Sequence, residues 1–381
     1  MKKASKTYRS GAALLVVLFV VMAITVLAAG FLNKSDVELA CGQNMQIRTQ
    51  MDSIARSALE HARGLILNPQ DVSGLYWTGA LRQQLVTGSS DFYDVDVVKT
   101  GGCDYTVSCQ AYREQAGERI GKSSLTGKIR LNPCIAYWQG AAEDISSKVT
   151  VNGDVYYNGM LLNYGTINGD VYCSSSITNL FSGTITGKQN NFASAPISSL
   201  LVGYSDFTTY YYIGSTKYFV GIIALAELNG VTLGPTAANP AGIYYREGSL
   251  DLKGVVQING TLVVRDDLRV NSGAKVIITA AKNFPALLVG NNLTYEASLT
   301  SLTIYGLAKI NDHIDMKNRN GCSLSVTGAL FVISDGIKNI FSSNVDITAS
   351  PERAALQFWA APGMPMRWSP AAGAFYKSVK R

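Results

Sequence analysis

Histidine is scarce in this chain, with only His61 and His313 among 381 residues. Catalysis by a serine or cysteine nucleophile needs a histidine base beside it, so this class of site is poorly supplied. The sequence also has no Walker-type glycine loop for phosphate and no CxxC spacing for zinc. We therefore expect a protein that is not an enzyme and that holds no cofactor and no metal ion.

Charged residues are also few, at 16% of the chain, which disfavours a disordered protein. The 36 glycines and 20 tyrosines favour strands and turns over helical bundles. Four cations lie in residues 1–11, so the net charge of +6 falls to +6 − 4 = +2 in the remainder, and no nucleic-acid partner is expected. The four cations are Lys2, Lys3, Lys6 and Arg9.

One long apolar run, Gly11 to Leu32, holds 22 residues without a charge. At about 1.5 Å per residue, such a helix spans the roughly 30 Å hydrocarbon core of a bilayer. A secretory signal peptide has an apolar core of only about 7–15 residues, so this run predicts a membrane-spanning helix. Because cations stay on the cytoplasmic side, we expect the N-terminus inside and residues 33 onward outside.

The junction at Gly11 is more specific than a plain membrane anchor. A short basic leader and a glycine precede the uninterrupted apolar segment GAALLVVLFVV, and a helical run containing Glu38 continues to Ala62. Over residues 9–67 this arrangement resembles the N-terminus of type IV pilins and pseudopilins, and most of all the PilX-type N-terminal domain of minor pilins.

The pilin resemblance implies that residues 1–11 are a leader, that a prepilin peptidase cuts after Gly11, and that Ala12 becomes a methylated first residue. It also implies that the helix over residues 12–32 assembles with other pilin or pseudopilin subunits. Major pilins carry glutamate at the fifth mature position, which is Val16 here, so an accessory subunit is favoured. An uncleaved membrane anchor is the alternative. The expected assembly contacts are Leu14, Leu15, Leu18, Val21 and Met22.

An amphipathic helix is predicted to continue the apolar run over residues 33–67. Apolar residues recur there at spacings of three and four, which places them on one face. Asn68-Pro69 is expected to end the helix. The apolar positions are Val37, Ala40, Met45, Ile47, Met51, Ile54, Ala58, Leu59, Ala62, Leu65 and Ile66.

Residues 68–140 are predicted to form a small antiparallel head on that helix. Segments 93–97, 105–111 and 125–131 alternate apolar and polar residues with period two, the pattern of half-buried strands. Gly79–Val86 is predicted as a short helix before them. A long helix followed by an antiparallel meander is also the arrangement that the pilin resemblance implies.

From about residue 141 the sequence repeats. Val151–Tyr156, VNGDVY, recurs after 16 residues as Ile167–Tyr172, INGDVY, and Ile185 begins a third copy of the corner 18 residues later. Short β-branched runs with Gly and Asn corners favour a stacked solenoid. The pattern resembles bactofilin-type and other right-handed parallel β-helices, with a sandwich or jelly roll as the competing fold. The predicted fold class is mainly β with a long N-terminal α-helix.

The predicted β-helix covers residues 141–350, with an insertion at about 189–243 that interrupts the repeat. The last segment, 351–381, contains several prolines and aromatic residues. It is predicted as a tail or as a cap, since an uncapped solenoid end exposes a sheet edge.

Parallel β-helices also carry polysaccharide-degrading enzymes, whose sites need clustered carboxylates. The best local cluster is Arg265-Asp266-Asp267 with Arg269, and Asp154 and Asp170 are predicted to stack on one face. The alternative for the first group is a solvated corner between turns. For the second group it is turn residues that bond their own backbone.

Six cysteines make disulfides a consideration for a chain that lies beyond the membrane. Cys103 and Cys109 would be about 20 Å apart on one extended strand at ~3.3 Å per residue, whereas a bridge needs Cα atoms within about 7 Å. Cys109 with Cys134 across the sheet is the preferred pair. Buried free thiols are the alternative.

Two functions from different classes follow from these patterns. The first is a non-catalytic minor pilin or pseudopilin that displays a β-helix on a pilus or a type II secretion-like filament. The second is a membrane-anchored β-helix that binds or degrades surface polysaccharides. For the first we expect a single-pass protein of the cytoplasmic membrane, with most of the chain periplasmic or at the cell surface.

Overall fold

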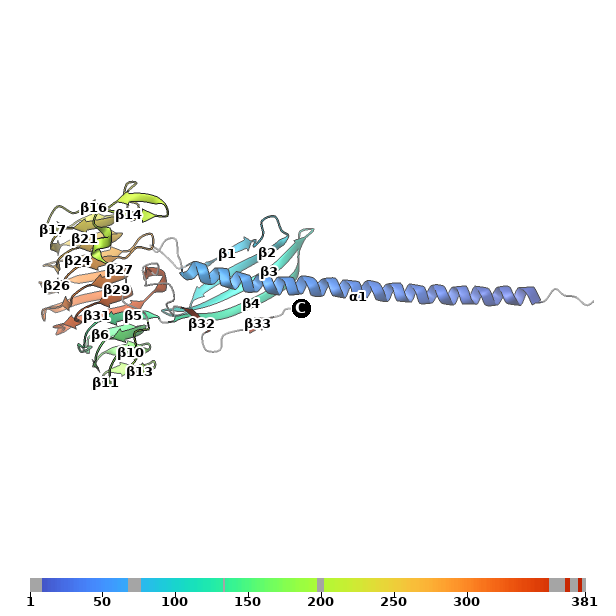
Figure 1. Ribbon diagram of the computed structural model, residues 1–381, viewed down its shortest axis with the longest axis horizontal. Helices are drawn as coiled ribbons and strands as arrows, with labels where there is room; N and C mark the ends of the chain where they lie inside the picture. The colour runs from blue at the N-terminus through green and yellow to red at the C-terminus, as the bar shows by residue number, and fades with distance from the viewer. Residues whose placement is uncertain are drawn as a thin grey trace, which may run out of the picture.

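The computed structural model has one long N-terminal helix, a small antiparallel sheet and a parallel β-solenoid of about 10 turns, so the predicted fold class is confirmed. The helix projects from one side of the small sheet, and the solenoid is stacked across the other side, which gives the outline of a T (Figure 1). The structure describes residues 9–67, 77–132, 134–196, 202–355, 367–370 and 376–378.

Helix α1 (Arg9–Leu67) is continuous and has two different halves. Every residue from 13 to 46 is exposed, and only the C-terminal part packs on the head. The buried positions there follow the predicted spacing of three and four, and the helix ends immediately before Asn68-Pro69, as expected. The fully packed positions are Met51, Ala55, Ala58, Leu59, Ala62 and Ile66.

The head sheet confirms the three predicted strands. They are β2 (Asp91–Lys99), β3 (Asp104–Gln115) and β4 (Glu118–Asn132), which pair antiparallel in this order. The apolar residues of β2 and β3 face α1, and the polar residues alternate with them toward solvent. Period-two alternation therefore reported both the strands and the buried face correctly.

The predicted short helix at Gly79–Val86 is wrong. The segment forms strand β1 (Gly79–Gln83), which pairs antiparallel with β2. Leu81, Leu85 and Val86 are all exposed, so a helix here would have had no apolar surface to pack on. The free edge of β2 offers backbone hydrogen bonds instead, and the extended conformation satisfies them.

The end of the chain returns to the head. Strands β32 (Arg367–Pro370) and β33 (Tyr376–Ser378) both pair antiparallel with β4. The prediction that this segment caps the solenoid is therefore wrong for these two strands, which complete the head sheet. The solenoid is thus inserted between β4 and β32, and the head is assembled from both ends of the chain.

The solenoid strands are short, and almost all pair in parallel. Two of its sheets carry the stack. The larger contains β5 (Ile135–Gln139), β6 (Val149–Asn152), β7 (Asp154–Tyr157), β9 (Thr166–Asn168), β10 (Val171–Cys173), β12 (Thr184–Ile185), β13 (Gln189–Asn190), β16 (Gly221–Ile222), β18 (Thr232–Leu233), β19 (Ile243–Arg246), β21 (Val255–Asn259), β22 (Thr261–Val264), β24 (Lys275–Thr279), β25 (Leu287–Val289), β27 (Ser301–Ile310), β29 (Asn320–Val332) and β31 (Ser342–Ala349).

The smaller sheet forms another side of the same turns. It contains β17 (Glu227–Asn229), β20 (Leu250–Lys253), β23 (Leu268–Val270), β26 (Leu293–Tyr295), β28 (Ile314–Asp315) and β30 (Ile337–Lys338). A further pair, β8 (Leu161–Asn163) and β11 (Ile177–Asn179), takes the corresponding place in the early turns. Outside the stack lie η1 (Tyr204–Phe207), the antiparallel hairpin of β14 (Tyr210–Ile213) and β15 (Thr216–Phe219), and η2 (Pro351–Arg353).

The chain enters the solenoid at its middle. β5 pairs with β29 on one side and β7 on the other, and β6 pairs with β31 and β9. The first turns wind outward to β13 at one end. The chain then reaches β16 at the opposite end and winds back until β31 meets β6 (Figure 1). We call the contact of β29 and β31 with β5 and β6 the seam.

The 16-residue repeat is one solenoid turn. Val151 pairs with Ile167 and Val155 with Val171, so the two NGD corners lie directly above each other. Gly153 of the first corner has φ +143°, and a Cβ there would lie 2.7 Å from the Ala349 side chain across the seam. Only glycine fits, which explains this residue of the motif.

The predicted insertion at 189–243 lies only partly outside the solenoid. Strands β16, β17 and β18 belong to its parallel sheets, whereas η1 and the β14–β15 hairpin are outside them. Phe207 and Tyr211 from these outer elements join Val263 and Leu288 of the large sheet in one buried cluster. A second buried cluster runs without a break from α1 through the head sheet into the solenoid interior.

Candidate functional site

The most prominent surface is the N-terminal half of α1, which we call the apolar rod (residues 13–33). It is long and apolar enough to cross a membrane. The first charged side chains after it are Lys34, Asp36 and Glu38, and Lys34 and Glu38 form an exposed i,i+4 ion pair. The rod packs on none of the described parts of the head or solenoid, because all of its residues are exposed.

All five predicted assembly contacts lie on the apolar rod. Leu14 is 74% exposed, Leu18 60% and Val21 54%, so large apolar side chains face outward along its whole length. Exposure of this extent is unfavourable in water and is relieved by lipid or by other helices. Gly11 and Ala12 lie near the beginning of α1, and cleavage between them stays a prediction. The other two predicted assembly contacts, Leu15 and Met22, are exposed as well.

A second functional element is the junction that holds the solenoid on the head. Glu352 of η2 is buried, and its carboxylate forms an ion pair with Lys99 of β2. It also accepts hydrogen bonds from Tyr105 Oη at 2.7 Å and Ser350 Oγ at 2.6 Å. Burial by itself raises the pKa of Glu352, but Lys99 and these hydrogen bonds outweigh burial and leave the pKa below its ordinary value.

The other side of the junction is held by Asp154. Its carboxylate accepts hydrogen bonds from the backbone N–H of Cys134 at 2.9 Å and of Asp170 at 3.0 Å, and from Arg130 Nη2 at 3.1 Å. Asp154 is almost completely buried, and this burial raises its pKa despite the three donors. Asp154 and Asp170 therefore stack at one corner as predicted, but as residues that bind backbone N–H groups.

The predicted disulfide Cys109–Cys134 is wrong. Cys134 is bonded to Cys103, with Cα atoms 5.9 Å apart. Cys103 lies in the turn before β3, which reaches the start of the solenoid, whereas Cys109 is in the middle of β3 with Leu125 opposite it. Burial raises the pKa of the free Cys109 thiol to about 12. The disulfide joins the head to the first residues of the solenoid.

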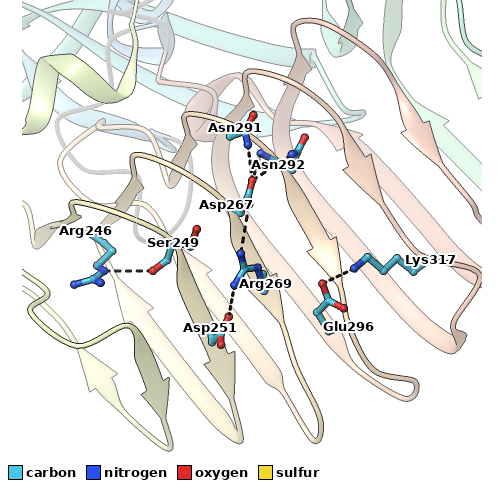
Figure 2. Close-up of polar contacts among 9 residues, drawn as sticks. All are labelled: Arg246, Ser249, Asp251, Asp267, Arg269, Asn291, Asn292, Glu296 and Lys317. Atoms are coloured by element: carbon cyan, nitrogen blue, oxygen red, sulfur yellow. Dashed lines mark hydrogen bonds and ion pairs between the residues drawn. The ribbon is translucent and has the colours of Figure 1, made fainter.

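The predicted carboxylate cluster at residues 265–269 forms a hydrogen-bonded corner. Asp267 Oδ1 accepts hydrogen bonds from Asn291 Nδ2 at 2.6 Å and from the backbone and side-chain N–H groups of Asn292 at 3.3 and 3.2 Å (Figure 2). Arg269 lies between Asp267 and Asp251, at 3.5 and 3.7 Å. The cluster lies at a corner between turns, as in the alternative of a solvated corner, and its polar groups in addition bind successive turns to one another.

Charges on the face of the smaller sheet are paired along neighbouring strands. Lys317 contacts Glu296 at 2.5 Å, and Lys253 contacts Glu227 at 2.5 Å. Figure 2 shows Arg269 and Lys317 each directed at an acidic neighbour. These pairs neutralise the face, and the two carboxylates flanking an open cleft that a glycosidase needs are not found among them.

A different face of the larger sheet carries polar side chains in register, and all of them are neutral except Asp346, with Ile277 as the one apolar member. Two outward columns follow the parallel pairing across β18, β21, β24, β27, β29, β31, β6, β9 and β12, and every member is exposed or half-exposed. We call this surface the hydroxyl face. Its columns are Thr232, Gln257, Ile277, Thr303, Ser325, Asp346, Thr150, Thr166 and Thr184, and Asn259, Thr279, Tyr305, Thr327, Thr348, Asn152 and Asn168.

Sequence reasoning missed the junction of Lys99 with Glu352. The two residues are more than 250 positions apart, and each is an ordinary charged residue at the end of a strand or turn. The available signal was weak: Glu352 directly follows a proline after the last β-branched run. The hydroxyl face could have been found from the threonines that alternate with apolar residues in each short strand.

No protein-family model matches the chain, and no curated protein sequence matches it. An ice-binding protein from the Antarctic ascomycete Antarctomyces psychrotrophicus is similar with a TM-score of 0.33 and 13% identity, over 57% of this chain and 95% of that one. The competence-associated pilin ComZ from Thermus thermophilus has a TM-score of 0.24 and 10% identity, over 87% and 98%. At these scores neither likeness bears on function. The architecture itself is compatible with a pilin-like helix followed by a β-helix.

Proposed function

We propose that this chain is a non-catalytic, membrane-anchored minor pilin-like or pseudopilin-like subunit. It assembles through the apolar rod into a type IV pilus or a type II secretion-like filament and carries the solenoid outward as its display domain. The observation that carries the proposal is the division of α1. One half is packed on the head, and the other half is an exposed apolar surface that is rigidly continuous with it.

The division of α1 supports assembly as well as anchoring. Residues 13–46 extend about 50 Å beyond the packed part at 1.5 Å per residue, which is more than the roughly 30 Å that a bilayer core needs. A simple anchor needs no rigid link to the domain it holds, whereas a filament subunit needs one to fix its head relative to neighbouring helices. Val16 at the fifth mature position favours an accessory place in the filament.

The absence of catalysis is part of the proposal and rests on the carboxylates. Asp154 and Asp267, which stood in the two candidate clusters, each accept several hydrogen bonds that hold turns together. Carboxylates used in this way are not free to activate water or protonate a leaving group.

Processing by a prepilin peptidase tests the proposal directly. We expect co-expression of the full chain with such a peptidase to yield a mature protein whose N-terminal sequence begins at Ala12. Replacing Gly11 with valine is expected to block the cut, whereas Gly30→Ala is a matched control because nothing lies within 4 Å of that position. A chain that keeps Met1 in the presence of an active peptidase would contradict pilin-like processing.

Assembly is tested separately from processing. Val21→Asp places a charge in the centre of the apolar rod, and we expect it to abolish cross-linking of the chain to pilin subunits in membranes. Ser53→Asp is the control, because Ser53 is exposed on the packed half of α1. Unchanged cross-linking in Val21→Asp would show that the rod is not the assembly surface.

The hydroxyl face favours a second candidate function, binding of an insoluble polysaccharide. Apart from Ile277 and Asp346, neutral hydroxyl and amide groups repeat there at the spacing of strands, about 4.8 Å, and suit an uncharged, hydroxyl-rich ligand with an extended surface. Detergent-solubilised full chain is expected to be retained on cellulose or chitin particles, and Ser325→Lys to weaken retention more than Ser272→Lys at an exposed corner. Absence of retention on both polymers would reject this candidate.

A further inference from the structure

Three metal-ligating side chains meet at a corner of the solenoid that the proposed function does not use. Asp312 and His313 lie in the corner between β27 and β28, and Asp335 lies in the corresponding corner between β29 and β30. These corners belong to successive turns, because the Asp335 N–H donates to the Asp312 carbonyl at 3.1 Å. One ligand atom from each of the three side chains lies within 4.8 Å of the other two.

His313 gives a separate reason to place a cation at this corner. Its Nδ1 is buried and makes no hydrogen bond among the described residues, yet it lies 3.2 Å from Asp312 Oδ2. No hydrogen bond joins the two atoms, so the buried Nδ1 is left without a partner beside a carboxylate oxygen, which is unfavourable in a partly buried site. A metal ion between the two atoms satisfies both. The other histidine, His61, differs because its Nδ1 has Tyr93 Oη as a partner at 2.9 Å.

The corner already attracts one cation. Lys338 Nζ contacts Asp335 Oδ2 at 2.7 Å, so this carboxylate is already paired with one ammonium group. The ammonium group therefore neutralises part of a local excess of negative charge. Binding of a metal ion would release Asp335 from Lys338, so the lysine competes with the metal.

We propose that Asp312, His313 and Asp335 bind one divalent transition-metal ion, with Zn²⁺ as the best-suited probe. One imidazole and two carboxylates, with water in the remaining position, form a ligand set that zinc accepts at about 2.0–2.2 Å. Ca²⁺ and Mg²⁺ prefer oxygen ligands alone, so the imidazole selects against them. This inference departs from the expectation that the chain holds no metal.

The structural consequence of the site is a link between turns near the seam. Asp335 lies in the corner that directly follows strand β29. Val332, the last residue of β29, pairs with Gln139 of β5, where the chain enters the solenoid. A bound ion would tie this turn to the one carrying Asp312 and His313. It would stabilise the stack where the chain first enters it.

The test uses the full chain in detergent, stripped of metal and titrated with ZnCl₂ by isothermal calorimetry. The background carries Cys41→Ser, because Cys41 is an exposed thiol that would bind zinc on its own. We expect one ion per chain with a dissociation constant below about 10 µM. We also expect a rise in the thermal midpoint of a few degrees, as for any ligand that binds only the folded state.

Three variants separate this site from adventitious binding. His313→Ala is expected to weaken zinc binding at least tenfold, and Asp266→Asn to leave it unchanged, since Asp266 is two turns away along the same corner. Lys338→Met is expected to tighten binding by about tenfold, because it removes a competing charge at contact distance. This last variant gains function, so a loss of folding cannot imitate its expected result.

Binding that is equally tight in the His313→Ala and parent chains would overturn the proposal. So would a dissociation constant above about 10 µM in the parent chain, or no tightening in Lys338→Met. Near-ultraviolet circular dichroism without zinc verifies that each variant is folded. Failure of this proposal would leave the pilin-like function untouched, since that function rests on α1.

Discussion

At the scale of single residues, the cysteines divide into three chemical environments. Cys103 and Cys134 form the disulfide, and Cys41 is exposed on α1. Cys109 is buried between the head sheet and α1, and its pKa is raised to about 12. A thiol reacts as its thiolate, so both burial and a high pKa make Cys109 unreactive at neutral pH.

We expect a maleimide reagent to modify only Cys41 in the native, detergent-solubilised chain at pH 7. Cys109 and the other buried thiols, Cys173 and Cys322, should react only after unfolding in denaturant. Intact-mass spectrometry before and after unfolding measures this, with the Cys41→Ser chain as the control. Modification of Cys109 in the native chain at a rate similar to that of Cys41 would contradict the packing of β3 on α1.

Gly121 is a second residue whose environment makes a sharp prediction. It has φ +59°, and a Cβ would lie 2.2 Å from the Ile47 side chain of α1. Gly117 in the same hairpin has φ +83° but nothing within 4 Å. Both alanine variants pay for backbone strain, whereas only Gly121→Ala also meets a clash.

We expect Gly121→Ala to lower the free energy of unfolding by about 1–3 kcal/mol more than Gly117→Ala does. Urea unfolding of the two variants, followed by far-ultraviolet circular dichroism, gives the difference. Equal losses would show that Ile47 moves aside without cost and that α1 does not press on β4 at this point.

At the scale of elements, η2 holds the solenoid on the head through Glu352. The folded-state pKa of this carboxyl is lower than its ordinary value, so the group adds stability at pH values above its unfolded pKa. That contribution is lost as the pH falls through the folded pKa. Acid therefore weakens the junction by protonating the Glu352 carboxylate.

Glu352→Gln is expected to cost about 2 kcal/mol of stability at pH 7, the range for a hydrogen-bonded charged group, and progressively less below about pH 4. Glu296→Gln, which breaks the more exposed pair with Lys317, is the control and should cost no more than about 0.5 kcal/mol at either pH. Denaturant unfolding at pH 7 and pH 3.5 measures both variants. A constant difference between wild type and Glu352→Gln across this range would refute the role of the ionised carboxylate.

The periodicity of apolar residues correctly predicted the helix and the strands that bury one face. The apolar spacing on α1 and the alternation in β2, β3 and β4 gave their positions, because burial on one face imposes a fixed period on each element. The same logic failed at Gly79–Gln83, where a segment with no apolar face took its conformation from the free edge of β2. The 16-residue repeat likewise reported one solenoid turn but not the order in which turns are wound.

At the scale of the whole molecule, contacts between distant parts of the chain could not be predicted. The pairing of β4 with β32, the disulfide of Cys103 with Cys134 and the ion pair of Lys99 with Glu352 join segments that carry no shared pattern. The site that we infer at Asp312, His313 and Asp335 is of the same kind. Its members become neighbours only because two turns are stacked.

Because the solenoid is inserted into the head, we predict that the head can fold without it. Asn132 of β4 pairs with Arg367 of β32, so a two-residue Asn-Gly turn in place of residues 133–366 would close a β-hairpin. With Cys103→Ser, we expect this shortened chain to fold into a head that melts cooperatively, at a lower temperature than the full chain because the shared core is cut.

Circular dichroism in detergent measures this melting. A matched chain that ends at Asn132 lacks β32 and β33, and it should melt at a still lower temperature because the edge of β4 is then unpaired. A shortened hairpin chain without a cooperative transition would mean that the head depends on the solenoid for folding.

Because the chain enters the solenoid at its middle, the length of the solenoid can change without changing its contacts with the head. Each further turn added at either outer end would lengthen that arm by about 4.8 Å, the spacing of adjacent strands. The connection from β13 to β16 would need only one or two more residues for each turn, at about 3.3 Å per residue. Lys99, Glu352, Cys103 and Cys134 would keep their places. Duplication or loss of turns can therefore change the length of the solenoid over evolutionary time without any change in its junction with the head.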